Sequence, residues 1–298
     1  MEQPKISIVI PTINRYKDLE NTIADLHKQT LPDFEILIID QTDKTQAKAI
    51  TTNKVKYFWK PFKSASKARN LGLLEAKADI VLFLDDDVII KNKNFLLHHF
   101  NYFKEPKTSG VAGAILELDE KWSNTLPKKA SKKYLGWIYT PRNYNKPIKI
   151  GDGGAGNLAV RKNWAIAIGG MDENYDKGAY REESDFCWRY TKKYGLMEFA
   201  PDAELIHIGN PSGGTRNWKN SRGIIHAKQH MFGAWYFMFK LLPKSVWVEY
   251  SWLTIRRFII HKNLIYRFYL LPKALYWFTA AFFKAIQLKN TPKYIEQQ

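Results

Sequence analysis

The stretch ADIVLFLDDDVII (residues 78–90) sets three consecutive carboxylates, Asp85, Asp86 and Asp87, directly after an apolar run. Residues 80–84 are continuously apolar instead of alternating, which is typical of a strand buried on both faces of a parallel sheet. Three adjacent like charges repel one another and do not fit a strand interior, so they belong at its end. Because ligands bind at the carboxyl ends of strands in open α/β sheets, the stretch predicts an α/β fold with a ligand site at the aspartates.

The sequence before and after this stretch alternates between segments typical of buried strands and segments typical of helices. Strands are expected at residues 6–10, 34–40, 55–60 and 110–118, and helices at residues 19–26 and 64–76. Short connections between them predict a mostly parallel, doubly wound central sheet flanked by helices. Residues 121–150 are rich in Lys and punctuated by Pro, so an exposed excursion is expected there.

The second half of the chain returns to this sheet through a glycine-rich bend, GDGGAGNLAVRK (151–162). The segment REESDFCWRYTKKYG (181–195) has helical spacing, with Phe186 and Tyr190 on one face and Gly195 as the expected C-cap. PDAELIH (201–207) is an alternating segment, which predicts a strand that ends at His207.

Composition indicates a folded chain with one large domain and an appendage. The 298 residues are 45% hydrophobic and 14% aromatic, which excludes a disordered protein. The single cysteine, Cys187, excludes an intramolecular disulfide framework and fits a reducing compartment. The apolar run in MEQPKISIVIPT (1–12) is too short for a secretory signal, so a cytoplasmic location is expected.

Positive charge and aromatic residues gather at the C-terminal end. Of the net charge of +17, residues 221–298 contribute twelve Lys or Arg against two acids. Basic residues interrupt each apolar run before it reaches the roughly 20 residues that span a bilayer. This pattern predicts helices that lie on an anionic membrane surface, with the protein peripheral on the inner face of the cell membrane. No nucleic-acid-binding motif is present, and the basic residues lie among bulky apolar ones instead of in a polar stripe. Nucleic acid is therefore not expected as a partner.

The aspartate triplet is the first candidate for chemistry. Mg²⁺ or Mn²⁺ prefers one or two protein carboxylates together with phosphate oxygens, so the triplet predicts a cation that binds a nucleotide diphosphate. His207 can complete such a site or bind a phosphate. The alternatives are a solvated acidic turn and a structural histidine.

A second acidic group comprises Glu182, Glu183 and Asp185. A carboxylate opposite a metal-diphosphate can take a proton from an attacking sugar hydroxyl, whereas acids in a first helical turn can also merely complement the helix dipole. The loop at residues 210–223 is basic, and Arg216 and Arg222 are candidates for a phosphate-binding lid. An ordinary mobile loop is the alternative.

Together these segments resemble glycosyltransferase family 2 enzymes with the GT-A fold. The resemblance covers roughly residues 5–210 and is carried by ISIVIPTINR (6–15), FEILIIDQTD (34–43), ASKARNLGLLEAKADIVLFLDDDV (65–88), GAGNLAVRK (154–162), IGGMDENYDKGAYREESDFCWRYTKKYG (168–195) and PDAELIHIG (201–209). It implies inverting transfer of a sugar from a nucleotide diphosphate donor, UDP-sugar favoured, to a saccharide or lipid-linked glycan, with Mn²⁺ or Mg²⁺ and a single displacement.

The resemblance also implies roles for individual residues. Asp87 matches the metal-binding end of the Asp-x-Asp motif, and His207 is taken as a further metal ligand. Glu183 matches the catalytic base, with Glu182 and Asp185 in support, and the acceptor-side segment matches Gly156 and Asn157. The residues expected at the donor are Pro11, Thr12, Asn14, Arg15, Asp40, Gln41, Arg69, Asp85 and Asp86. Two residues at the expected nucleotide-base site depart from the family pattern. Ile13 stands where many members have an aromatic residue that stacks on the base, and Gln41 stands where they often have an acidic residue or Asn. The Gln41 amide can both donate to and accept from a pyrimidine edge.

This interpretation divides the chain into a glycosyltransferase domain (1–225) and a helical extension (226–298). Residues 1–118 form the nucleotide-binding half of that domain and residues 119–225 the acceptor half and lid. Two other functions remain as alternatives. A haloacid-dehalogenase-like phosphatase would use Asp85 as its nucleophile, and a GT-A-fold binding protein would keep the nucleotide or glycan site without turnover.

Overall fold

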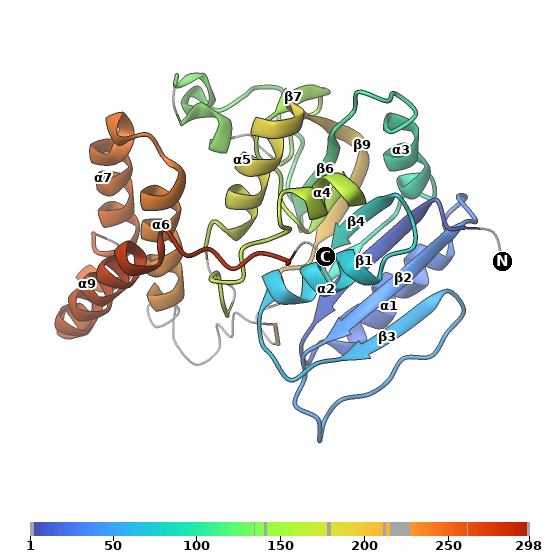
Figure 1. Cartoon of the computed structure of the whole chain (residues 1–298), viewed down its shortest axis with the longest axis horizontal. Coiled ribbons are helices and arrows are strands. Elements are labelled where there is room, and N and C mark those ends of the chain that lie inside the picture. The colour runs from blue at the N-terminus through green and yellow to red at the C-terminus, as the bar shows by residue number, and fades with distance from the viewer. Residues whose placement is uncertain are drawn as a thin grey trace.

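A computed structural model describes residues 3–133, 135–139, 142–177, 180–210, 213–214, 227–260 and 262–296. Its centre is a mixed nine-stranded sheet in the order β3-β2-β1-β4-β8-β6-β9-β5, with β7 paired to β9 (Figure 1). The strands are β1 (Ile6–Thr12), β2 (Phe34–Asp40), β3 (Val55–Trp59), β4 (Ile80–Leu84), β5 (Val88–Ile89), β6 (Gly110–Glu117), β7 (Ile148–Ile150), β8 (Asn157–Arg161) and β9 (Met197–His207).

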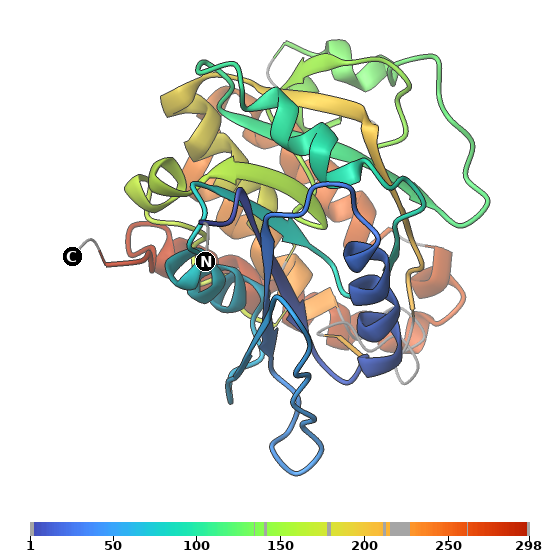
Figure 2. The same cartoon turned by 90° about the vertical axis from the view of Figure 1, so that its right-hand side faces the viewer.

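The first half of the sheet confirms the expected parallel arrangement. β3, β2, β1 and β4 are all parallel, and α1 (Tyr16–His27) and α2 (Ala65–Glu75) connect them. Figure 2 shows α1 and α2 on opposite faces of these strands. Ile8 packs in one core cluster with Leu19 of α1, whereas Val9 packs in the other cluster with Leu73 of α2. Burial on both faces explains why these strands are apolar throughout.

The second half of the sheet is mixed, so the expectation of parallel strands does not extend to it. β8 is antiparallel to both β4 and β6, and β5 is antiparallel to β9. Antiparallel strands need no crossover helix, which explains how β8 enters the sheet directly from the glycine-rich bend. Helices α3 (Phe95–Tyr102), α4 (Lys162–Ala167) and α5 (Glu182–Tyr194) flank this half, and α5 ends at Gly195 with φ 87° as expected.

The excursion at residues 121–150 is only partly exposed, contrary to the sequence-based expectation. It contains the 3₁₀ turns η1 (Lys128–Ser131) and η2 (Gly136–Tyr139) and ends in β7, which pairs with β9. Leu135 and Ile138 are buried against the C-terminal helices. Lys and Pro content indicated exposure, but these apolar residues needed a partner surface that lies far away in the sequence.

The C-terminal helices are α6 (Ala227–Leu241), α7 (Trp247–Phe258), α8 (Lys262–Ile265) and α9 (Leu271–Leu288), with the 3₁₀ turns η3 (Lys244–Val246) and η4 (Phe268–Leu270). α6 contacts α5, α7 and α9, and its aromatic residues fill a third core cluster. After α9 the chain returns across the molecule (Figure 1), where Ile295 N donates to Gly169 O (2.9 Å). None of the helices in the described ranges is long and apolar enough to cross a membrane.

Candidate functional site

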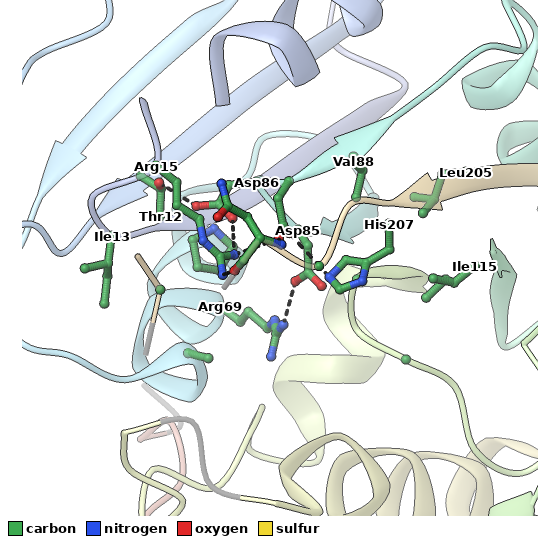
Figure 3. A pocket seen from close by; sticks show the side chains of 18 of the residues that line it. Thr12, Ile13, Arg15, Arg69, Asp85, Asp86, Val88, Ile115, Leu205 and His207 are labelled. Atoms are coloured by element: carbon green, nitrogen blue, oxygen red, sulfur yellow. Dashed lines mark hydrogen bonds and ion pairs between the residues drawn. The ribbon is translucent and has the colours of Figure 1, made fainter. Parts of the chain in front are cut away.

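A cavity of about 210 Å³ lies where the carboxyl ends of β1 and β4 meet. The chain runs from β1 outward to β2 and β3 and then returns to place β4 on the other side of β1. Such a reversal of strand order leaves a crevice at the strand ends, which is where open α/β sheets bind ligands. Thr12 lines this cavity together with Asp85 and Asp86 (Figure 3), and Asp87 lines it as well.

Asp86 lines the cavity and accepts hydrogen bonds from two other lining residues. Its Oδ2 accepts from Thr12 Oγ1 (2.7 Å), and its Oδ1 accepts from Arg15 Nη1 (3.1 Å). The residue is only 3% exposed, and this burial raises the pKa of its carboxyl to about 7, although Arg15 opposes the rise. Asp86 therefore holds the end of β1 and Arg15 in position.

Asp87 lies between Arg15 and His207. Arg15 Nη1 is 2.9 Å from Oδ2, which also accepts from Asn210 N (3.1 Å), and His207 Nε2 is 3.4 Å from Oδ1. Burial would raise the pKa of Asp87, but the contact with His207 and the charge of Arg15 outweigh it and lower that pKa. The same contact raises the pKa of His207 to about 9.

The residues present fit a divalent cation. Asp85, Asp87 and His207 each offer one ligand atom, and these atoms lie within 4.8 Å of one another. Asp87 Oδ1 is buried and has no hydrogen-bond partner among the described residues. The two carboxylates suit Mn²⁺ or Mg²⁺, and a histidine that ligates a metal must first lose its proton.

Arg69 connects the aspartate triplet to the start of α5. Its Nη2 is 3.3 Å from Asp85 Oδ1, and its Nη1 is 3.1 Å from Glu182 Oε1. Gly156 makes room for the Asp85 carboxylate, because a Cβ at position 156 would lie 2.4 Å from Asp85 Oδ2. The geometry thus brings the two predicted acidic groups to one place.

Glu183 lies between this cavity and a second cavity of about 340 Å³, and it lines both. Its nearest cations are Arg69 Nη2 (3.9 Å from Oε1) and Arg142 Nη2 (4.0 Å from Oε2). Both distances exceed hydrogen-bond range, so neither arginine donates a hydrogen bond to this carboxylate. The side chain is 26% exposed, and a substrate in either cavity can reach it.

Several predicted site residues are used by the fold instead. Asp40 is fully buried and accepts from the hydroxyl groups of Tyr16 (2.6 Å) and Tyr57 (2.5 Å). Asn14 lines neither the first nor the second cavity. Its backbone N–H donates to Thr42 Oγ1 (2.9 Å), and its φ is 55°. Gln41 lines the first cavity, and its Oε1 already accepts one hydrogen bond from Ser64 N (2.6 Å).

Asn157 and Asp185 also point into the protein core. The Asn157 amide donates to Ala114 O (3.0 Å) and Ala203 O (2.9 Å), so of the predicted acceptor pair only Gly156 lines a cavity. Asp185 is fully buried between Arg189 (2.7 Å) and Lys240 (2.6 Å). Burial would raise its pKa, but these two cations hold the pKa below its usual value.

The remaining predicted residues have different outcomes. Pro11 lines the first cavity together with Thr12, Arg15 and Arg69, whereas Arg216 and Arg222 lie outside the described residues. Sequence reasoning missed Arg142, which lines both cavities, and Asn210, whose backbone contacts Asp87 and Arg15. Asn210 directly follows the recognised segment that ends at residue 209, which is a usable signal, but nothing around Arg142 distinguished it from its basic neighbours.

Comparison with known proteins agrees with this geometry. The model of the family described as Glycosyl transferase family 2 matches residues 7–169, more than half of the 298-residue chain. Poly(ribitol-phosphate) β-N-acetylglucosaminyltransferase TarP of Staphylococcus aureus is 33% identical over 37% of this chain and 36% of its own length. GalNAc(5)-diNAcBac-PP-undecaprenol β-1,3-glucosyltransferase of Campylobacter jejuni is 34% identical over 28% of this chain and 30% of its own length.

The match therefore spans only about a third of the length of these two relatives. Among solved structures, a mannosyltransferase from Pyrobaculum calidifontis in complex with GDP-Man and Mn²⁺ superposes with a TM-score of 0.55. It is 15% identical, and the superposition covers 98% of this chain and 80% of that one. At this identity the likeness shows the shared GT-A fold.

Proposed function

This chain belongs to glycosyltransferase family 2, and from that premise we propose that it transfers a hexose, with inversion, from a UDP-sugar to a saccharide or lipid-linked glycan. The observation that carries the proposal is the position of Glu183, which lies between the cavity with the aspartate triplet and a second cavity. A donor in the first cavity and an acceptor in the second would meet at this carboxylate. The family assignment gives no support to the dehalogenase-like phosphatase.

The chain's own residues account for the main requirements of a single displacement. Glu183 takes the proton from the acceptor hydroxyl as it attacks, which is the role of a general base. Arg69 lies between Asp85 and Glu183, with Nη2 at 3.3 Å and 3.9 Å from their carboxylate oxygens. Attack from the face opposite the leaving group inverts the anomeric centre, and holding both substrates side by side lowers the entropic barrier. A cation held by Asp85, Asp87 and His207 would supply positive charge to the departing diphosphate.

Donor binding tests this proposal directly. A UDP-sugar with Mn²⁺ at about 100 times its Kd is expected to raise the Tm by about 5 °C, because only the folded protein binds it. Differential scanning fluorimetry with UDP-glucose, UDP-N-acetylglucosamine and GDP-mannose measures the shift, with EDTA as the control. Equal shifts in EDTA, or a shift with GDP-mannose alone, would contradict the proposed donor class.

We also propose peripheral attachment of the C-terminal helices to an anionic bilayer. The described part of the chain exposes large apolar side chains mainly here, at Val248, Trp252, Ile260, Ile265, Tyr266, Phe268, Tyr269, Leu271, Leu275, Tyr276, Phe283 and Ile286. Basic residues lie among them, and Lys273 Nζ is 4.8 Å from the centre of the Trp277 ring. Exposed aromatic residues with interspersed Lys and Arg suit the membrane interface.

The wild-type protein is expected to co-sediment with phosphatidylglycerol vesicles at low salt. Replacing both Phe268 and Tyr269 by Ser should weaken this binding at least tenfold, because the apolar area that the two side chains bury in the membrane is lost. These side chains are 76% and 68% exposed. Leu196→Ser is the matched control, because Leu196 is 53% exposed but lies outside the C-terminal helices. Equal sedimentation of all three proteins, or none with the wild type, would reject membrane attachment.

A further inference from the structure

The second cavity is built jointly by the glycosyltransferase core and the C-terminal helices. Arg142 comes from the excursion before β7, Arg181 is the N-cap of α5, and His230 and Arg257 belong to α6 and α7. Ile138 and Phe199 supply an apolar wall. Four basic side chains from four distant segments therefore face one cavity, next to the proposed catalytic base.

Tyr180 orders two of these arginines. The guanidinium carbons of Arg181 and Arg257 lie 4.6 Å and 4.4 Å from the centre of its ring. Stacking on an aromatic ring uses the face of a guanidinium group and leaves its N–H donors available at the edge. With two guanidinium groups over it, the Tyr180 ring is poorly placed to stack on a neutral sugar.

The carboxylates of the cavity do not consume these donors. Glu182 pairs with Arg69, Asp152 accepts from Ser184 Oγ (3.0 Å), and Glu183 is no closer than 4.0 Å to Arg142. Among the described residues, no carboxylate lies within ion-pair distance of Arg257. Arg181 Nη1 donates to Ser184 Oγ (3.3 Å), whereas its Nε is buried and has no hydrogen-bond partner in the described part of the chain. The cavity thus keeps an excess of cationic donors.

Taking the proposed function as given, we propose that this cavity binds a phosphate group of the acceptor, with Arg257 and Arg181 as its donors. Arginine forks match the oxygens of a phosphate, and aromatic stacking holds both guanidinium groups ready. The acceptor class is therefore a phosphate-bearing saccharide, polyol or lipid, whose attacking hydroxyl points to Glu183. The α7 helix then acts in acceptor recognition in addition to any contact with a membrane.

Binding of sn-glycerol 3-phosphate and farnesyl phosphate to the full chain, measured by calorimetry in EDTA, tests this. Arg257→Gln is expected to weaken both about tenfold or more, as one charge-assisted contact is lost, while Arg256→Gln stays within twofold. Arg256 is the matched control because it precedes Arg257 on α7 and does not line the cavity. A much higher affinity for farnesyl phosphate would support a lipid source of the phosphate, and similar affinities a polymer or free source.

Two outcomes would overturn the proposal: equal weakening by both substitutions, or an equal effect of Arg257→Gln on neutral methyl glucoside. UDP binding with Mn²⁺, measured on the same proteins, separates this from the proposed function. If UDP binds and the phosphate probes do not respond to Arg257, only the acceptor inference fails. If UDP does not bind at all, the donor assignment fails instead.

Discussion

Glu183→Gln is expected to lower kcat for sugar transfer by about 10²–10⁴-fold, while the Kd of the nucleotide-sugar changes less than twofold. The amide keeps the shape of the side chain but cannot take a proton from the acceptor hydroxyl. Donor binding is expected to change little because the aspartate triplet, Thr12, Arg15 and Arg69 also line the first cavity and are all retained. Single-turnover rates at saturating donor and acceptor, with calorimetry of donor binding, measure both quantities.

Two further variants show whether the base is correctly assigned. Glu75→Gln removes an exposed carboxylate at the end of α2 and should leave kcat unchanged. Glu182→Gln should lower the Tm instead, because Glu182 is 4% exposed and pairs with the buried Arg69. Wild-type kcat in Glu183→Gln would remove Glu183 from this role, and normal donor binding without any transfer by the wild type would favour the silent binding protein.

The sequence predicts the parallel half of the sheet well because each strand carries its own signal. Residues 36–39 and 80–84 are apolar on both faces, and the structure has strands at Phe34–Asp40 and Ile80–Leu84. The antiparallel half depends on how the glycine-rich bend delivers β8 to β4, and no local periodicity encodes that pairing. The burial of Leu135 and Ile138 likewise depends on α6, about 100 residues away in the sequence.

For the candidate site, the sequence named both the acidic groups and the basic residues Arg15, Arg69 and His207, but not which of them contact one another. A divalent cation alone was expected to make the triplet tolerable, whereas the structure adds three cationic side chains: Arg69 at Asp85, Arg15 at Asp86 and Asp87, and His207 at Asp87. Such contacts arise between segments that are distant in sequence. Asp185 and Asn157 were predicted from their motif positions, and the structure shows that both side chains are buried, which the motif did not indicate.

Asp87→Asn is expected to weaken Mn²⁺-dependent binding of UDP by at least about 10–100-fold. Loss of a residue that only supports a metal ligand already weakens metal binding by this factor, and Asp87 is a candidate ligand itself. Asn keeps one oxygen but loses the charge that attracts a cation, and Oδ1 of Asp87 is the buried oxygen that faces His207. The fold should survive, because Arg15 retains its contact with Asp86 and the repulsion between two adjacent carboxylates disappears. Calorimetry of UDP with and without Mn²⁺ measures the first effect, and thermal unfolding in EDTA the second.

Asp79→Asn is the matched control, since Asp79 is exposed next to the amino end of the same strand, β4, far from the cavity lining. It should bind UDP and Mn²⁺ like the wild type. In Asp87→Asn, His207 also loses the partner that raises its pKa to about 9, so its ring should titrate nearer its ordinary value and NMR can follow it. If UDP binding by Asp87→Asn depends on Mn²⁺ as it does in the wild type, the cation binds elsewhere. If the wild type binds UDP equally well in EDTA and in Mn²⁺, diphosphate binding at this triplet needs no cation.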